Sequence, residues 1–244
     1  MFPYRDDNPT LETPVVTMLL IAANAAVWIL VQGMGQDPTL ARSVCQLGLI
    51  PAEYLGRVAP GTSIPLSPGE VCVLGVEHHW YTPLSSMFLH GSWLHIIGNM
   101  WFLWLFGNNV EDSMGHGRYL AFYLLCGLAA AAAQTFVSPS SIVPMVGASG
   151  AISGVMGAYI VLYPRVRIHM LIVLVFFITR IVVPAYLMLG YWFLLQLVSG
   201  SAAQSEGGVA FWAHVGGFLA GAALIVLFRD PVLVQRHRAM ARFV

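Results

Sequence analysis

Four polar residues occur within apolar stretches of this sequence, and their types are those that perform nucleophilic catalysis. Ser149 lies in GASGAISG and His214 lies in AFWAHVGGFLAG. A serine and a histidine within hydrogen-bonding reach form a nucleophile and its general base. His95 and Asn99, in HGSWLHIIGNM, are spaced i and i+4 and would share one face of a helix. Together with the backbone N–H of Ser149, they could donate the hydrogen bonds that stabilise an oxyanion.

The segments that carry these residues have the composition of membrane helices. Apolar residues make up 58% of the 244 residues and charged residues only 9%, whereas about 25% of the residues in a soluble domain are charged. Only helices or closed barrels satisfy the backbone inside a bilayer. The apolar runs are continuous rather than alternating, so the sequence predicts an all-α fold, a polytopic membrane helical bundle in one domain.

Six membrane-spanning helices are expected within residues 14–228. The region of residues 168–198 is too long for one straight span and is interrupted by Arg180 and Pro184. We therefore expect a helix at Ile181–Val198 and place Ile168–Ile178 at the interface or in a re-entrant segment. The other five expected spans are Pro14–Met34, Trp93–Asn108, Tyr119–Val137, Val146–Tyr163 and Val209–Phe228.

The distribution of arginine predicts the orientation, because cytoplasmic loops collect basic residues. If the N-terminus is inside, only Arg42 and Arg57 of the 11 basic residues lie outside. Residues 1–13 and 229–244 are then short cytoplasmic tails, and the long loop of residues 35–91 is external. The first residues match neither a signal peptide nor a transit peptide, which favours a bacterial plasma membrane. Topology explains the arginines, so we expect no nucleic-acid partner.

This topology brings the candidate residues to one depth. The second, fourth and sixth spans all run inward, and His95, Ser149 and His214 each follow the outer end of a span by a few residues. Glu111 and Asp112 lie near the opposite end of the second span. We therefore predict a Ser–His dyad without an acidic third member, and a hydrogen-bonding role for Glu111 at a helix end.

The glycines around Ser149 allow a second interpretation. Small residues at intervals of three or four let helices pack closely, and taken alone GASGAISG is more often a packing face than an active site. Packing requires neither a histidine at matching depth on the sixth span nor polar residues on the second. The combination therefore favours catalysis. The small residues in question are Gly150, Gly154 and Gly157 in the fourth span and Gly217 and Gly221 in the sixth.

Two of the three cysteines lie in the loop that this topology places outside, where disulfides persist. Cys45 and Cys72 are predicted to be bridged, with two free thiols as an equal alternative. Their spacing is not that of a metal site. Cys126 lies in the third span and is expected to be a small buried side chain.

These elements together resemble the rhomboid family of intramembrane serine proteases. The matching motifs are HGSWLHIIGNM, GASG and AHVGGFLAG, in a segment from about Trp80 to Gly221. The resemblance implies that Ser149 is the nucleophile and His214 the general base, with His95 and Asn99 around the oxyanion.

The resemblance also implies structural positions near this site. His90 corresponds to the family's structural histidine, tied to the loop before the second span, and Gly147, Gly150 and Gly217 belong to the two glycine motifs. Two residues depart from the family pattern. Tyr81 follows Trp80 where an arginine is common, and Ser153 replaces a tyrosine that packs on the catalytic histidine in some members. Trp212, Phe218 or a neighbouring helix must then cover His214.

The resemblance implies substrates that are transmembrane proteins in the lipid bilayer, with helices that unwind easily near the outer face. Their entry is expected through a lateral gate between the fifth and second spans. No metal and no cofactor is implied. The alternative function is a catalytically silent relative that binds membrane clients. A transporter would require paired charges or repeated halves, and the sequence has no such repeat.

Overall fold

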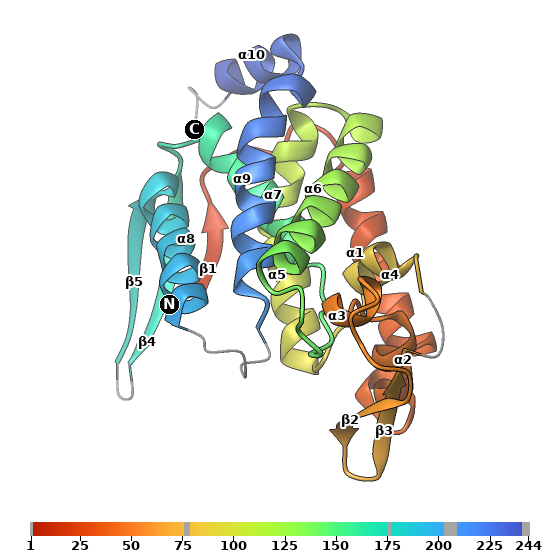
Figure 1. Ribbon diagram of the computed structural model, residues 1–244. Coiled ribbons are helices and arrows are strands. Elements are labelled where there is room, and N and C mark those ends of the chain that lie inside the picture. The colour runs from red at the N-terminus through yellow and green to blue at the C-terminus, as the bar shows by residue number, and fades with distance from the viewer. Residues whose placement is uncertain (1, 76–78, 175–176, 203–208, 241–244) are drawn as a thin grey trace.

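The computed structural model describes residues 2–75, 79–174, 177–202 and 209–240. The chain is mostly helical, and its long helices surround α7 (Figure 1). The C-terminal helix α10 (Pro231–Met240) lies at one end of the bundle, and the hairpin of β2 (Thr62–Ser67) and β3 (Glu70–Leu74) lies at the other. Parts of the expected outer loop and C-terminal tail, residues 76–78 and 241–244, lie outside the described residues.

Six long helices correspond to the expected spans, with shifted ends. Three of them, α6, α8 and α9, are long and apolar enough to cross a bilayer, whereas α1 and α7 are apolar but shorter. The α5 helix has 20 residues and ends in the polar sequence NNVED. The number of spans therefore stays a prediction. The bounds are Val15–Leu30 for α1, Trp93–Asp112 for α5, His116–Val137 for α6, Ser149–Leu162 for α7, Ala185–Ala202 for α8 and Phe211–Phe228 for α9.

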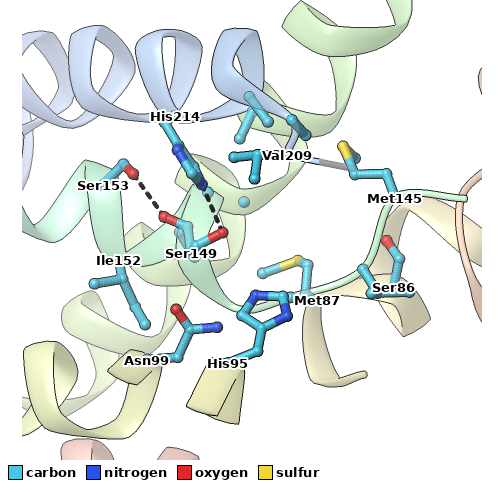
Figure 2. Close-up of a pocket in the computed structure, with 18 of the residues that line it drawn as sticks. Ser86, Met87, His95, Asn99, Met145, Ser149, Ile152, Ser153, Val209 and His214 are labelled. Atoms are coloured by element: carbon cyan, nitrogen blue, oxygen red, sulfur yellow. Dashed lines mark hydrogen bonds between the residues drawn. The ribbon is translucent and has the colours of Figure 1, made fainter. Parts of the chain in front are cut away.

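The closest contact between helices is that between α7 and α9. A Cβ atom added to Gly217 would meet the carbonyl oxygen of Gly150, and one added to Gly221 would meet that of Gly154. The absence of side chains therefore lets the two backbones touch, as the small-residue pattern predicted. Figure 2 shows the result at one end of the pair, where His214 on α9 faces Ser149 on α7.

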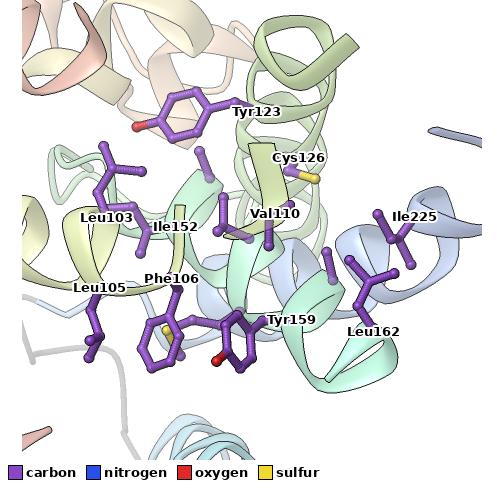
Figure 3. Packing of buried hydrophobic residues seen from close by; sticks show 14 of the residues in the cluster. Leu103, Leu105, Phe106, Val110, Tyr123, Cys126, Ile152, Tyr159, Leu162 and Ile225 are labelled. Carbon is purple, nitrogen blue, oxygen red and sulfur yellow. The ribbon is translucent and has the colours of Figure 1, made fainter. Parts of the chain in front are cut away.

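The α7 helix is the centre of the hydrophobic core. All its residues from Gly150 to Tyr159 are buried, and so is Leu162. Around it pack side chains from α5, α6 and α9, including Phe106, whose ring lies 5.0 Å from that of Tyr159 (Figure 3). Cys126 on α6 is fully buried against Gly154, as predicted for a small hydrophobic residue. A helix enclosed on all sides holds the residues at its ends in fixed positions.

Glu111 joins the first two long helices. Its carboxylate accepts hydrogen bonds from the backbone N–H groups of Val16 and Thr17, both at 2.8 Å, and from the Thr17 hydroxyl at 2.7 Å. These N–H groups belong to the first turn of α1, where no intrahelical acceptor exists. The prediction that Glu111 is a hydrogen-bonding residue at a helix end is confirmed.

The expectation of a purely helical fold was wrong in the segment before α8. The strands β4 (Arg167–Leu174) and β5 (Phe177–Pro184) form an antiparallel hairpin, so the helix expected at Ile181–Val198 begins only after Pro184. This segment is rich in Ile and Val, whose branched side chains favour strands. The N-terminal strand β1 (Phe2–Asp6) pairs with β4 and completes a three-stranded sheet of order β1-β4-β5.

The N-terminal segment is bound to the bundle rather than free. The indole N–H of Trp101 on α5 donates a 2.7 Å hydrogen bond to the carbonyl of Pro3, and β4 and β5 contact α8. Asp7 accepts from His169 and pairs with Arg167. Burial raises the pKa of Asp7, but the His169 hydrogen bond and the positive charges around it outweigh burial and hold the pKa below its usual range.

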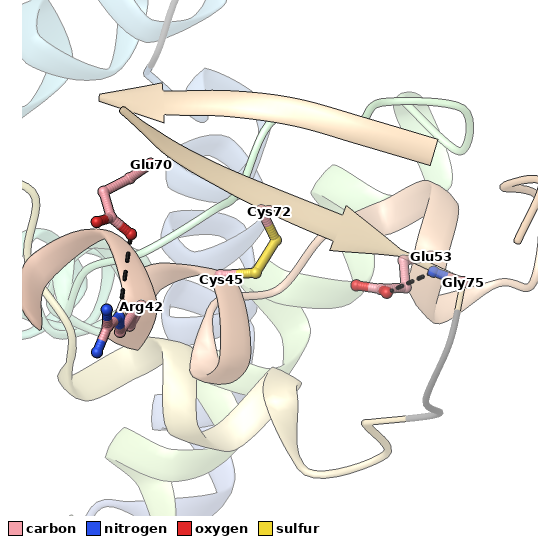
Figure 4. Close-up of a disulfide and its surroundings, with 6 residues drawn as sticks. All are labelled: Arg42, Cys45, Glu53, Glu70, Cys72 and Gly75. Atoms are coloured by element: carbon pink, nitrogen blue, oxygen red, sulfur yellow. Dashed lines mark hydrogen bonds and ion pairs between the residues drawn. A yellow bond between two sulfur atoms is a disulfide. The ribbon is translucent and has the colours of Figure 1, made fainter. Parts of the chain in front are cut away.

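The long loop after α1 is folded around a disulfide. Cys45 on α2 (Thr39–Leu47) is bonded to Cys72 on β3, with their Cα atoms 5.5 Å apart (Figure 4). The predicted bridge is confirmed. A small second core of Ile50, Ile64 and Leu74 surrounds it. The loop's remaining elements are η1 (Gly33–Gly35), α3 (Pro51–Tyr54), α4 (Thr82–Ser85) and η2 (Ser86–Phe88).

The contact between α7 and α9 predicts a difference between two glycines. Gly221→Ala should lower the free energy of unfolding by about 1 to 3 kcal/mol, the usual cost of overpacking, because its Cβ would meet the Gly154 backbone. Gly190→Ala on α8 is the matched control, since open space surrounds that position. Thermal unfolding in detergent measures both. Equal stabilities of the two variants would contradict a backbone contact at Gly221.

Candidate active site

Three helix beginnings bring the predicted site residues together. Ser92 caps α5 by accepting from the N–H of His95 at 3.2 Å, so His95 lies in the first turn. Ser149 is the first residue of α7 rather than a few residues inside it, because Pro144 and the positive φ of Gly147 keep the preceding segment non-helical. His214 is in the first turn of α9.

Ser149 and His214 are in direct contact. The Nε2 atom of His214 lies 2.8 Å from the Oγ atom of Ser149 (Figure 2). Ser153, where some family members have a tyrosine, donates a 2.6 Å hydrogen bond back to the Ser149 carbonyl and stays within its own helix. The geometry is that of a hydroxyl nucleophile beside a general base.

Two residues of α8 contact the other side of His214, and sequence analysis missed both as site residues. The Oε1 atom of Gln196 lies 2.8 Å from Nδ1 of His214. The ring of Trp192 lies 5.8 Å from the imidazole at an interplanar angle of 38°. The sequence left open whether Trp212, Phe218 or a neighbouring helix covers His214. The neighbouring helix α8 does so, with the ring of Trp192. One feature of the sequence could have identified them: Gln196 is a polar residue one turn from Trp192 in an apolar helix.

His95 and Asn99 provide hydrogen-bond donors beside Ser149. The N–H of Gly91 donates to Nδ1 of His95 at 3.3 Å, so the proton of the neutral ring lies on Nε2. A Cβ atom on Gly147 would stand only 2.7 Å from that Nε2 atom. The Nδ2 group of Asn99 is buried and has no hydrogen-bond partner in the described part of the chain. Both residues line the same cavity as Ser149.

The glycine motif and His90 form the support of this arrangement. Gly147 has a φ of 127°, which disfavours other residues, and Gly150 packs against Ala130 on α6. His90 is fully buried, and its ring lies 5.1 Å from that of His95. Gln32, at the end of α1, accepts from the His90 N–H and donates to its carbonyl at 2.7 and 2.8 Å. Sequence analysis missed Gln32.

The candidate site adjoins a second cavity that is less apolar than its own. Ser149 and His214 line a cavity of about 380 Å³ that is mostly apolar. A second cavity of about 620 Å³ lies between the loop of residues 138–146 and the start of α9. The two cavities share the residues His95, Met145, Val146, Val209 and Ala210. Water can therefore approach Ser149 from the end of the bundle that carries the disulfide loop.

Comparison with known proteins identifies the family. The family model described as Rhomboid domain matches residues 77–231, which is more than half of the chain. The chain belongs to the rhomboid family. This rhomboid is a membrane-embedded protein whose apolar helices carry the candidate site.

Several characterised rhomboids are similar to it. Rhomboid protease GluP of Bacillus subtilis is 35% identical over 150 residues, which are 61% of this chain and 27% of that protein. Rhomboid protein 1, mitochondrial, of Saccharomyces cerevisiae is 27% identical over 64% of this chain and 44% of its own. Rhomboid-like protein 11, chloroplastic, of Arabidopsis thaliana is 37% identical over 31% of this chain and 26% of its own. This rhomboid thus spans less than half of each relative.

The contact between Ser149 and His214 predicts selective reactivity toward a serine-directed probe. A fluorophosphonate should label the purified protein at Ser149, because the imidazole can accept the hydroxyl proton as the phosphorus is attacked. Labelling should fall at least about 100-fold in His214→Ala, the usual scale of general-base loss. Ser153→Ala is the matched control, since its hydroxyl donates to the Ser149 carbonyl within the same helix. Equal labelling of the His214→Ala variant would contradict activation by His214.

Proposed function

We propose that this rhomboid is an intramembrane serine endopeptidase that cleaves transmembrane segments with a Ser–His dyad. The observation that carries the proposal is the 2.8 Å contact between His214 Nε2 and Ser149 Oγ. The family supports it, and so does the Nδ2 group of Asn99, which has no partner among the described residues. A rhomboid protease is also among its relatives.

In the proposed acylation step, His214 removes the proton from the Ser149 hydroxyl as Oγ attacks the carbonyl carbon of the scissile peptide bond. Three groups are in position to donate to the resulting oxyanion: Nε2–H of His95, Nδ2–H of Asn99 and the N–H of Ser149. That last N–H belongs to the first residue of α7 and has no intrahelical acceptor. The positive end of the α7 dipole adds to the stabilisation.

The tetrahedral intermediate then collapses and the C–N bond breaks. His214 gives its proton to the departing amine, which leaves an acyl ester on Ser149. Water enters through the second cavity, which shares His95 and Val146 with the site. His214 accepts a proton from this water, and the hydroxide attacks the ester carbonyl. Collapse releases the carboxylate product and returns the proton to Oγ. This sequence of steps uses no metal and no cofactor.

The proposed substrates are transmembrane proteins whose helices unwind near the site. A helix hides its carbonyl groups in hydrogen bonds, so Gly, Pro or small polar residues are needed for an extended segment to reach Ser149. We further propose lateral entry between α5 and α8 on the side of Trp101 that is nearer Ser149, since β1 joins α5 at Trp101 to the hairpin that contacts α8. Unchanged reporter cleavage after crosslinking α5 to α8 would contradict this route.

The proposed arrangement in the bilayer follows from charge. Residues 14–228 form the membrane domain with six spans, and the site opens to the outside of a bacterial plasma membrane. Residues 1–13 and 229–244 belong to the cytoplasmic end, from which β1 extends along α5 as far as Trp101. The disulfide between Cys45 and Cys72 supports an external loop, because oxidising compartments preserve such bonds.

Cleavage of a transmembrane reporter tests the proposed activity. The purified protein in liposomes should cut a single-span reporter with Gly and Ala in its outer half, and Ser149→Ala should not, because the hydroxyl beside His214 is then absent. Gel analysis and mass spectrometry of the products measure the cut. Absence of cleavage of several reporters by the folded wild type would favour the competing function, a catalytically silent protein that binds membrane clients.

A further inference from the structure

We propose that Gln196 is a positioning residue for His214, and that α8 must be docked on α9 for Ser149 to be activated. This inference rests on the proposed protease function and adds a third, neutral member to the predicted dyad. It assigns to α8 a role in catalysis as well as in substrate entry.

Two hydrogen bonds of Gln196 fix which nitrogen of His214 carries the proton. The Nε2 group of Gln196 donates to the carbonyl oxygen of Trp192 one turn back at 3.3 Å, so the amide oxygen faces His214. This oxygen lies 2.8 Å from Nδ1 and can only accept, so Nδ1 must be protonated. The Nε2 lone pair of His214 is then directed at the Ser149 hydroxyl, as a general base requires.

The choice of an amide rather than a carboxylate suits the surroundings of His214. A carboxylate buried in an apolar site carries a large desolvation cost, and ionisable groups in spans are costly. The dipole of the Gln196 amide orients the imidazole without a net charge. The same oxygen stabilises the positive charge that develops on the ring when it accepts the proton of Ser149.

The half of α8 that carries Gln196 has no fully buried residue and touches the bundle through its contacts with α9. The buried residues of α8 are Ala185, Met188 and Leu189, all near its beginning. Beyond them, α8 contacts α9 through the rings of Trp192 and Phe193, which lie 6.2 and 4.7 Å from the ring of Phe218. Near the end of α8, Gly200 also lies against Phe211 and Trp212 at the start of α9. Leu194, Leu195 and Val198 are exposed on its outer face.

Movement of this half therefore changes the state of the base. Separation of α8 from α9 removes the amide oxygen from Nδ1 and the Trp192 ring from the imidazole face. His214 then loses the contacts that set its tautomer and orientation while Ser149 stays in place on α7. A substrate that enters between α5 and α8 would meet an incomplete site, which is completed when α8 returns to α9.

Kinetics of Gln196 variants in liposomes test the role of the amide. Gln196→Met keeps the side-chain length and removes the acceptor, so both kcat and the rate of fluorophosphonate labelling should fall about 10- to 100-fold, with KM nearly unchanged. Gln196→Glu restores an acceptor and should recover most of the rate. The acidic limb of the pH–rate profile of Gln196→Glu should move to higher pH, because a carboxylate beside Nδ1 favours the protonated imidazole. Leu195→Ala, on the exposed face of the same helix, is the control.

A double-mutant cycle tests the dependence on α8 docking. Phe193→Ala removes the stacked contact with Phe218 and should lower the labelling rate by acting through Gln196. The double variant Phe193→Ala/Gln196→Met should then lose less than the product of the two single losses. Additive losses would overturn the coupling between α8 docking and the base.

The remaining outcomes separate this inference from the proposed function. Wild-type rates in Gln196→Met, with Ser149→Ala inactive, would overturn the role of Gln196 and leave the protease intact. Equal losses in Gln196→Met and Gln196→Glu, accompanied by lower unfolding temperatures, would also overturn it, because they indicate a structural residue. A folded wild type that neither cleaves the reporter nor reacts with the probe would remove both proposals.

Discussion

The backbone contact between α7 and α9 is the constraint on which the rest of the structure depends. Glycines on both helices let the chains approach so closely that any Cβ atom at Gly217 or Gly221 would collide with the backbone of α7. Ser149 and His214 lie at the same end of this pair, so the helix spacing sets the distance between their side chains. The packing interpretation and the catalytic interpretation of GASGAISG are therefore compatible, since the glycines that pack the helices also position the serine.

The surroundings of the histidine show how an ionisable side chain is placed in an apolar bundle. In the described part of the chain, the contacts of His214 are neutral: a hydroxyl, an amide and an indole ring. His95 likewise receives a backbone N–H rather than a charge. These carboxylates lie away from His214: Glu111 is buried at the end of α5, where it accepts from the start of α1, and Asp7 pairs with Arg167. Charge is thus confined to places where hydrogen bonds or water can compensate for burial.

The three-stranded sheet gives the helical bundle a second kind of connection. Strand β1 comes from the N-terminus and β4 and β5 come from the segment before α8, so residues far apart in the chain are paired. Trp101 ties this sheet to α5. The sheet therefore restrains the beginning of α8, while the half that carries Gln196 is held mainly by aromatic contacts with α9. A helix held firmly at one end and loosely at the other can pivot.

Properties that depend on short stretches of sequence could be predicted. The apolar runs gave the helices of the bundle, the i and i+4 spacing put His95 and Asn99 on one face, and the glycine pattern gave the contact between α7 and α9. The hydrogen-bonding role of Glu111 could be predicted because it is a carboxylate at the end of a helix. There it accepts from the N–H groups in the first turn of another helix. The motifs around Ser149 and His214 are also local, so the sequence indicated which residues to compare.

Properties that depend on pairing between distant segments were decided only by the tertiary structure. The hairpin of β4 and β5 was not predicted because an apolar run alone does not distinguish strand from helix, and β1, which pairs with β4, lies at the other end of the chain. Gln32 and Gln196 gave no local indication of their partners, because an amide can donate or accept anywhere in the fold. The sequence by itself determined the chemistry of the candidate site and the helices that carry it. The three-dimensional packing decided how His214 is oriented, because that orientation is set by a hydrogen bond between helices.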